Sequence, residues 1–156
     1  MIATPDASSL HRADGIDEVP QRTLYRILQL RESVFVVEQE CAFLDLDGHD
    51  LDPATRQLWF ETAGGEVVAA LRILDRGSVE PGLACLSRIV ARPDWRGRGL
   101  AGALVAAALD ECAGRPIVLD AQSRLTPWYA RFGFVVAGEE FLEDGLPHTP
   151  MRREAG

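Results

Sequence analysis

The sequence predicts a single α/β domain built on one mixed β-sheet. Its length of 156 residues suits one domain with a sizeable core and leaves little chain for a second. Segments with strand-like and helix-like apolar spacing alternate along the chain, in the order β-α-β-β-β-α-β-α-β-β. The composition, with 47% hydrophobic and 26% charged residues, is ordinary for a globular protein, and the chain contains no internal repeat.

The N-terminal part predicts a tail followed by a helix. Residues 1–18 are polar and weakly patterned, so we expect a flexible segment with a possible edge strand, and the domain itself over residues 19–156. From Pro20 onward, apolar residues such as Leu24, Ile27 and Leu28 recur at helical spacing. The apolar run at residues 34–37 fits either a buried strand or the end of this helix, and we favour the helix.

The middle of the chain predicts an acidic loop and three strands. Residues 43–53, FLDLDGHDLDP, form the loop. Residues 57–61 and 66–74 predict a β-hairpin, because Gly64 and Gly65 between them supply the positive φ that tight turns require. Residues 83–91 predict a further strand.

The C-terminal part predicts two more helices and three more strands. A helix is expected over residues 99–113 and a strand over 116–120. Residues 126–132 predict a short helix, in which Pro127 suits the first turn. The chain then ends in two antiparallel strands, expected at residues 134–141 and 148–153.

Charge and cysteine content exclude several classes of function. The net charge of −8 and pI of about 4.8 argue against nucleic acid as a partner and favour a cationic substrate. The three cysteines are far apart and lack C-x-x-C spacing, which argues against a disulfide framework and a thiolate metal site. No apolar stretch reaches the roughly 18 residues of a membrane span, and the first ten residues do not resemble a secretory signal. We therefore expect a cytoplasmic protein that does not contact membranes.

The acidic loop invites a calcium interpretation that its spacing does not support. If Gly48 is taken as the loop glycine of an EF-hand, Phe43 and Ala54 occupy positions that require oxygen ligands. Other histidines and carboxylates are too scattered to propose a metal site. The loop is expected to form an acidic rim that attracts amines, or a hydrogen-bonded turn.

The most informative segment is the glycine loop R-G-R-G-L-A-G at residues 96–102. It lies between a predicted strand and a predicted helix, where free backbone N–H groups converge on an anion. Glycines lack the Cβ that would hold phosphate oxygens away, and Arg96 and Arg98 add positive charge. The loop therefore predicts a binding site for the pyrophosphate of a nucleotide-like cofactor.

Two other phosphate-binding loops fit this segment less well. A P-loop needs a lysine, and the chain contains none. The spacing of Gly97, Gly99 and Gly102 matches the dinucleotide pattern G-x-G-x-x-G, with Asp120 at the end of the next strand. However, residues 92–96 separate strand from glycine, and too little chain follows Asp120 for a doubly wound sheet.

The chain resembles the GNAT superfamily of N-acetyltransferases. Residues 96–101 match that family's loop R/Q-x-x-G-x-G/A, and residues 129–134, YARFGF, match its second signature, Y-x-x-x-G-F. The resemblance extends to the ElaA-like branch through residues 28–39, 45–50 and 142–148, so that the motifs span nearly the whole chain. It implies a mixed, mostly antiparallel sheet, splayed near the cofactor and flanked by helices.

The resemblance also implies acetyl-CoA as co-substrate and a role for particular residues. Tyr129 is the candidate general acid for the leaving CoA thiolate. Gln122 stands where many relatives place an asparagine that binds the pantetheine arm. The remaining cofactor-binding candidates form the strand edge that would hold the pantetheine and the loop that would hold the pyrophosphate: Ile89, Val90, Ala91, Arg96, Gly97, Arg98, Gly99, Leu100, Ala101 and Gly102.

The expected acceptor is a primary amine of a small molecule, a polyamine or a protein N-terminus. An alkyl ammonium must lose its proton before it can attack, so a base is expected near the thioester. Glu38 and His148 are the candidate substrate-binding residues. A non-catalytic CoA-binding module remains the alternative function, and the sequence carries no indication of an oligomeric state. The candidate bases are Glu38, His49, Asp50, Glu139, Glu140, Glu143 and His148.

Overall fold

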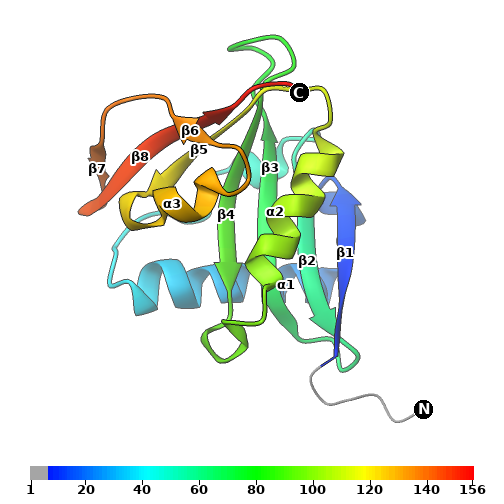
Figure 1. Ribbon diagram of the computed structural model, residues 1–156. Helices are drawn as coiled ribbons and strands as arrows, with labels where there is room; N and C mark the ends of the chain where they lie inside the picture. The colour runs from blue at the N-terminus through cyan, green and yellow to red at the C-terminus, as the bar shows by residue number, and fades with distance from the viewer. Residues whose placement is uncertain (1–6) are drawn as a thin grey trace.

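The computed structural model describes residues 7–156, which fold into one twisted sheet with helices on both faces (Figure 1). Within those residues the sheet has eight strands. The strands are β1 (Ser8–Asp14), β2 (Arg56–Thr62), β3 (Val67–Asp75), β4 (Ala84–Ala91), β5 (Ile117–Gln122), β6 (Val135–Val136), β7 (Phe141–Glu143) and β8 (Leu146–Arg153). The helices are α1 (Gln21–Arg31), α2 (Leu100–Glu111) and α3 (Thr126–Ala130), with a π-helix, η2 (Glu32–Glu38), directly after α1. Short 3₁₀ turns are η1 (Ile16–Glu18), η3 (His49–Leu51), η4 (Pro93–Trp95) and η5 (Ser123–Leu125).

The sheet is mostly antiparallel, as expected, and it opens in the middle. The strand order is β1-β2-β3-β4-β5-β8-β6, with β7 also pairing with β8. Strands β4 and β5 form the parallel pair, and it covers only Ala84 opposite Ile117 and Cys85 opposite Val118. Beyond these residues the two strands separate, so the C-terminal half of β4 has an edge that β5 does not occupy.

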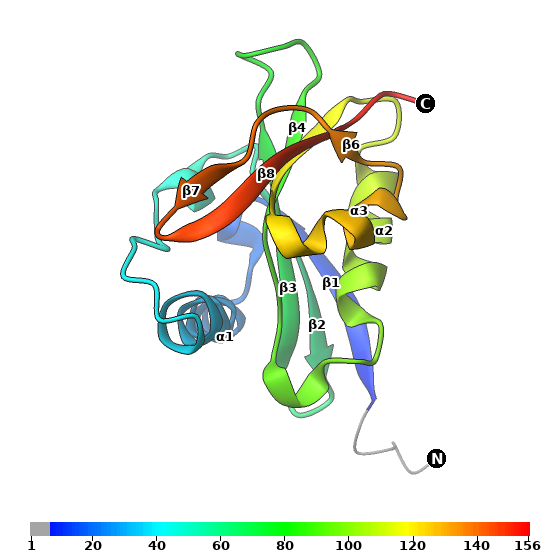
Figure 2. The ribbon, with the colours of Figure 1, turned by 60° about the vertical axis from the view of Figure 1, so that its left-hand side comes forward.

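Two apolar cores lie on opposite faces of the sheet. Helices α2 and α3 cover one face, where Leu104, Val105 and Phe134 are almost completely buried. Helix α1 covers the other face, where Ile27 and Leu30 pack toward the first four strands. Figure 2 shows α1 on the side of the sheet away from α2 and α3. The separation of β4 and β5 is therefore framed by helices from both layers.

The structure adds three details to the predicted fold. Residues 1–6 lie outside the described residues, and β1, in the segment expected to contain a possible edge strand, pairs with β2 along its whole length. Residues 34–37 are helical, as favoured, but wound as a π-helix. The strand expected over residues 134–141 is broken into β6 and the start of β7: Ala137 still donates to the Pro150 carbonyl, but Pro150 has no N–H to return a bond to this stretch. No helix within residues 7–156 is long and apolar enough to cross a membrane.

Candidate active site

The glycine loop presents its backbone to solvent at the start of α2. Gly97 and Gly99 have φ of 79° and 77°, a left-handed conformation that disfavours every residue with a Cβ. The first bond of α2 runs from the Ala103 N–H to the Gly99 carbonyl. The N–H groups of residues 100–102 therefore have no acceptor inside the helix. A Cβ at Gly97 or Gly99 would meet nothing within 4 Å, so the space beside this loop is open to an anion.

The two loop arginines are held by neighbouring side chains. Arg98 stacks over the ring of Trp95, with 4.3 Å between its guanidinium carbon and the ring centroid. Arg96 makes a two-pronged ion pair with Glu38 at the end of η2, with N···O distances of 2.6 and 2.8 Å. This pair ties the loop to the helical layer on the α1 side of the sheet. It also brings together two residues that the sequence analysis assigned to different roles.

Glu38 is poorly suited to act as a base. Its side chain is 40% exposed, and the hydrogen bonds from Arg96 hold the pKa of its carboxyl below the usual value. Sequence analysis included Glu38 among the candidate bases, and the structure leaves this carboxylate too exposed for burial to raise its pKa. The carboxylate instead positions Arg96.

Strand β4 carries a bulge immediately before the segment expected to hold the pantetheine arm. Its register against β3 shifts between Ala70 and Arg72, and Arg88 has a φ of 52°. Ile89, Val90 and Ala91 follow, along the part of β4 that β5 has left. Unpaired main-chain groups along such an edge can bind an extended ligand as an added strand.

Tyr129 lies in an apolar environment at the other side of this opening, on α3. Its side chain is only 7% exposed, and its ring packs edge-on against Trp128 and Phe134, with centroid distances of 4.9 and 6.2 Å. Within residues 7–156 no group forms a hydrogen bond with its hydroxyl, and burial raises the pKa of Tyr129 to about 12. The hydroxyl is thus protonated at neutral pH and able to donate to a ligand.

Gln122 and His148 face each other across the β5–β8 ladder. Gln122 donates to the Gln39 side-chain oxygen at 3.2 Å, so it contacts the segment that follows η2. His148 Nδ1 lies 2.8 Å from the carbonyl oxygen of Leu146. A carbonyl only accepts, so Nδ1 carries the proton, and Nε2 of the neutral ring has a free lone pair. Nε2 lies 3.8 Å from Glu143.

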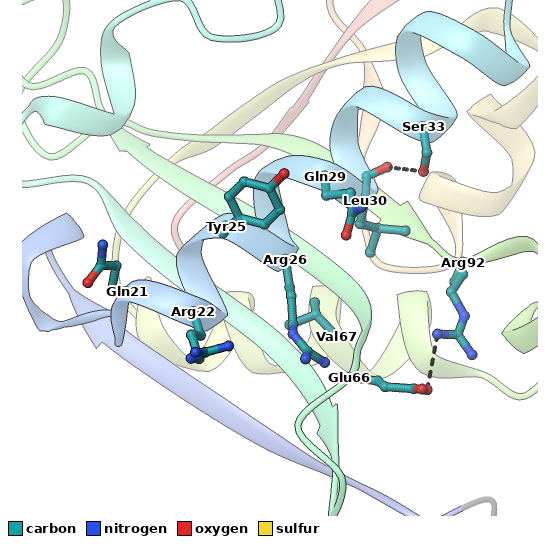
Figure 3. A pocket seen from close by; sticks show the side chains of 10 residues that line it. All are labelled: Gln21, Arg22, Tyr25, Arg26, Gln29, Leu30, Ser33, Glu66, Val67 and Arg92. Atoms are coloured by element: carbon teal, nitrogen blue, oxygen red, sulfur yellow. Dashed lines mark hydrogen bonds and ion pairs between the residues drawn. The ribbon is translucent and has the colours of Figure 1, made fainter.

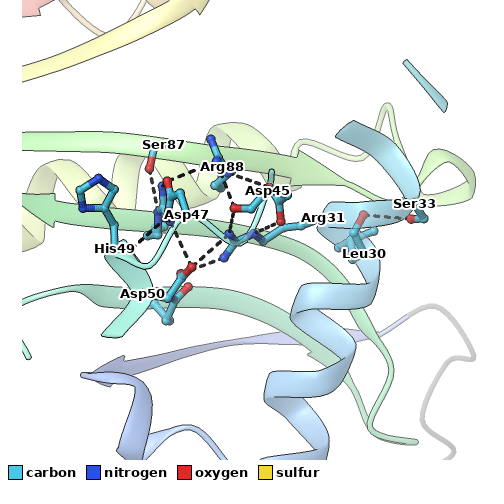
Figure 4. Close-up of polar contacts among 11 residues, drawn as sticks. Leu30, Arg31, Ser33, Asp45, Asp47, His49, Asp50, Ser87 and Arg88 are labelled. Atoms are coloured by element: carbon cyan, nitrogen blue, oxygen red, sulfur yellow. Dashed lines mark hydrogen bonds and ion pairs between the residues drawn. The ribbon is translucent and has the colours of Figure 1, made fainter. Parts of the chain in front are cut away.

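The acidic loop is a hydrogen-bonded turn that packs onto the sheet, and it does not form an acidic rim. Asp45 and Asp50 are 6% and 5% exposed and bind the buried guanidinium of Arg31. Asp47 and Asp50 bind Arg72 of β3 with N···O distances of 2.9 to 3.1 Å (Figure 4). With Arg88, which contacts Asp45 and Asp47, three arginines face three aspartates.

Sequence reasoning missed this buried ion network, which removes Asp50 from the candidate bases. The available signal was the motif D-x-D-G-x-D together with arginine at position 31 of a predicted buried helix and at position 72 of a predicted core strand. An arginine on an apolar face requires a buried counter-charge. Within the described residues, no contact connects Tyr129 with the exposed His49, Glu139 or Glu140.

A cavity of about 810 Å³ lies elsewhere, between α1 and the adjoining ends of β3 and β4 (Figure 3). None of the site residues expected from the sequence lines it. Arg92 forms an ion pair with Glu66 in its wall, and Ser33 donates to the Leu30 carbonyl. Its lining comprises Gln21, Arg22, Tyr25, Arg26, Gln29, Leu30, Ser33, Glu66, Val67 and Arg92.

Comparison with known proteins identifies relatives over almost the whole chain. The family model described as Acetyltransferase (GNAT) domain matches residues 48–155. A UPF0039 protein of Mycobacterium tuberculosis is 44% identical over 136 residues, which cover 87% of each chain. The ElaA protein of Escherichia coli is 37% identical over 144 residues, 88% of this chain and 91% of ElaA.

Solved structures agree with these relatives. The crystal structure of an acyl-CoA N-acyltransferase from Pseudomonas aeruginosa superposes with a TM-score of 0.87 at 36% identity, covering 94% of this chain and 99% of that one. The crystal structure of E. coli ElaA gives a TM-score of 0.86 at 33% identity, covering 95% and 100%. The mixed α/β architecture with its divided sheet is therefore shared with these proteins.

Proposed function

The chain belongs to the GNAT acetyltransferase family and is an acetyl-CoA-dependent N-acyltransferase, and from this we propose that it transfers an acetyl group to a primary amine by direct attack. The acceptor classes we propose are a small molecule, a polyamine or a protein N-terminus. The observation that carries the proposal is the end of β4–β5 pairing at Cys85 and Val118, which opens the β4 edge immediately before an exposed glycine loop.

Donor binding follows from backbone groups more than from side chains. The N–H groups of residues 97–102, at the positive end of the α2 dipole, suit the pyrophosphate of acetyl-CoA. Main-chain groups of Ile89, Val90 and Ala91 suit the amide groups of its pantetheine arm. Gln122 is a further candidate contact, although its amide is already engaged with Gln39 and Arg124. The donor would supply an activated thioester carbonyl at the opening between β4 and β5.

We propose that Tyr129 assists the departure of the CoA sulfur. In the reaction the acceptor nitrogen bonds to the acyl carbon while the carbon–sulfur bond breaks, and the sulfur leaves as a thiolate. A thiol has a pKa of about 8.5, so full proton transfer from a hydroxyl whose pKa is about 12 is uphill. Tyr129 therefore acts by donating a hydrogen bond to the departing sulfur, and solvent completes the protonation.

We propose that His148 accepts the proton that the acceptor ammonium must lose. Its Nδ1 is committed to the Leu146 carbonyl, which orients the ring and leaves Nε2 as the basic atom. It lies opposite Gln122 in the ladder, on the strand pair that flanks the opening. Nε2 would accept the proton from the ammonium, and a carboxylate oxygen of Glu143 lies 3.8 Å from this atom.

Release of free thiol from acetyl-CoA in the presence of an amine panel tests this function. We expect amine-dependent release well above the hydrolysis blank, with acetylated amine identified by mass spectrometry. A protein that binds CoA tightly but transfers to no amine in a broad panel would instead be a CoA-binding module. The Gly99→Glu variant, which places a charged side chain among the loop amides, serves as the matched control without donor binding.

A further inference from the structure

Arg88 lies at the β4 bulge and extends its side chain over the acidic loop. Its Nε lies 2.7 Å from an Asp45 carboxylate oxygen, and its Nη2 lies 3.3 Å from Asp47 and 3.1 Å from the Asp45 carbonyl oxygen. The guanidinium also covers the ring of Phe43, with 5.4 Å to the centroid. Nη2 is thus hydrogen-bonded to the acidic loop, whereas the buried Nε is in ion-pair contact with Asp45 without forming a hydrogen bond.

The third nitrogen, Nη1, has no such contact within residues 7–156. This nitrogen is not fully buried, so it reaches solvent. Figure 4 shows one end of the Arg88 guanidinium directed away from Asp45 and Asp47. Those carboxylates also contact Arg31 and Arg72, toward β3. The opposite side of β4 is the side from which β5 has separated.

Two side chains on β5 and β8, across the opening from Arg88, lie on the same face of the sheet as Arg88. Leu119, Ala121 and Met151 point into the core beneath α2. Side chains alternate along a strand, so Gln122 and His148 point to the other face, which is the face on which Arg31 of α1 meets the acidic loop. Arg88 and His148 therefore lie on the same face of the sheet, on the two groups of strands that the opening separates.

Charge compensation within the network is unequal. Burial lowers the pKa of Arg72, but its hydrogen bonds and charge pairing with Asp47 and Asp50 more than offset this, and the pKa is raised. Burial also lowers the pKa of Arg88, and the nearby charges of Arg72 and Arg31 lower it further, beyond what the aspartates restore. An additional anion beside Arg88 would oppose these effects.

We propose that Nη1 of Arg88 binds a carboxylate of the acyl acceptor, so that the substrate is an amino acid or another amine with a carboxylate a few bonds from its nitrogen. This inference rests on the proposed acetyl transfer to an amine. An amino carboxylate has an anionic end for Arg88 and a nitrogen whose proton His148 accepts. The protein's net charge of −8 does not attract anions from a distance. Salt screens charges beyond about 10 Å, so Arg88 would select a carboxylate only once the substrate is in the site.

Matched acceptors test the proposal in the wild-type enzyme. Each of a set of amino acids is compared with its amide and with the amine left after removal of the carboxylate, for example phenylalanine, phenylalaninamide and 2-phenylethylamine. We expect kcat/KM for the amino acid to exceed that for either partner by about tenfold or more, as for a charge-assisted hydrogen bond. An enzyme that acetylates amines without this preference retains the proposed function and overturns the carboxylate site. An amide whose kcat/KM equals that of the amino acid would also overturn the carboxylate site.

Arg88→Lys tests the residue. Lysine keeps the positive charge beside Asp45 but lacks a second arm directed toward the opening. We expect the preference for the carboxylated acceptor to fall close to one, through a higher KM, with CoA affinity and the thermal unfolding midpoint near wild type. Arg22→Lys, in the distant cavity, is the matched control and should keep the wild-type preference. An unchanged preference in Arg88→Lys would refute the assignment.

Binding measurements separate failure of this proposal from failure of acetyl transfer. If no amine is acetylated, titration of CoA-loaded protein with the same amino acids, followed by calorimetry, measures the site directly. Binding by wild type that weakens about tenfold in Arg88→Lys supports the carboxylate site even without transfer. Absence of binding to wild type overturns it.

Discussion

Substitution of Asp50 by asparagine is expected to destabilise the fold severely. The Asp50 carboxylate accepts two hydrogen bonds from Arg31, one from Arg72 and one from Gln57, at 2.8 to 3.1 Å. Arg31 and Arg72 are 1% and 2% exposed. Asparagine keeps the shape but removes the charge, so two buried guanidiniums lose a shared counter-ion. Breaking a buried pair in this way costs about 3 to 5 kcal/mol.

Urea unfolding followed by circular dichroism measures this loss. For a chain of this size, 3 to 5 kcal/mol corresponds to a fall in Tm of roughly 6 to 20 °C. Glu66→Gln is the matched control, because it breaks the exposed Glu66–Arg92 pair, which should contribute less than about 1 kcal/mol. If Asp50→Asn unfolds within about 1 kcal/mol of wild type, the network does not hold the acidic loop as described.

Asp50→Asn should also weaken the dependence of the free energy of unfolding on pH in the acid range. Burial alone would raise the pKa of Asp50, but hydrogen bonding from Arg31 and the charges of Arg31 and Arg72 hold it below 3.8. The unfolded chain therefore binds this proton at higher pH than the folded chain does. The stabilisation is complete above a pH of about 4 and is lost as the pH falls toward the lower folded-state pKa. Asp50→Asn should lose this component of the pH dependence.

Three further substitutions test the assigned chemistry. Gly99→Glu should abolish CoA binding in calorimetry while the protein stays folded by circular dichroism, because Gly99 is exposed at the start of α2, a Cβ there meets nothing within 4 Å, and the strain of the left-handed φ is only about 1 to 2 kcal/mol; retained tight binding would contradict the loop assignment. Tyr129→Phe should lower kcat at least about tenfold with unchanged CoA affinity, since it removes only the hydroxyl; wild-type turnover would exclude its role. His148→Gln should lower kcat about a hundredfold or more at neutral pH; a rate within twofold of wild type would assign the base elsewhere.

The order of elements and the cofactor loop could be predicted because each depends on local patterns. The β2–β3 hairpin follows from two apolar runs on either side of Gly65, whose φ is 84°. The glycine loop follows from a strand, a short connecting segment, two glycines and a helix in close succession. Tyr129 was marked by a local signature, and the structure places it, buried, on α3.

The ion network and the bulge could not be predicted because they depend on contacts between distant segments. Arg31 and Asp50 are 19 residues apart, and Arg72 and Asp47 are 25 apart. Arg31 and Arg72 in apolar segments indicate that a counter-charge is needed, but which aspartates supply it depends on how the loop folds over β2 to β4. The positive φ of Arg88 likewise has no sequence marker, since this conformation is expected of glycine or asparagine.

The π-helix η2 makes a second connection, besides β4, between the buried ion network and the glycine loop. Arg31, which ends α1, anchors in the buried network, and Glu38, at the far end of η2, grips Arg96 beside the cofactor loop. A π-turn accommodates one residue more than an α-turn. Loss of a single residue from this segment would rotate Glu38 by about 100° relative to Arg31, too far for both ends to stay engaged. The length of this one helical segment thus matches the spacing between the buried ion network and the glycine loop.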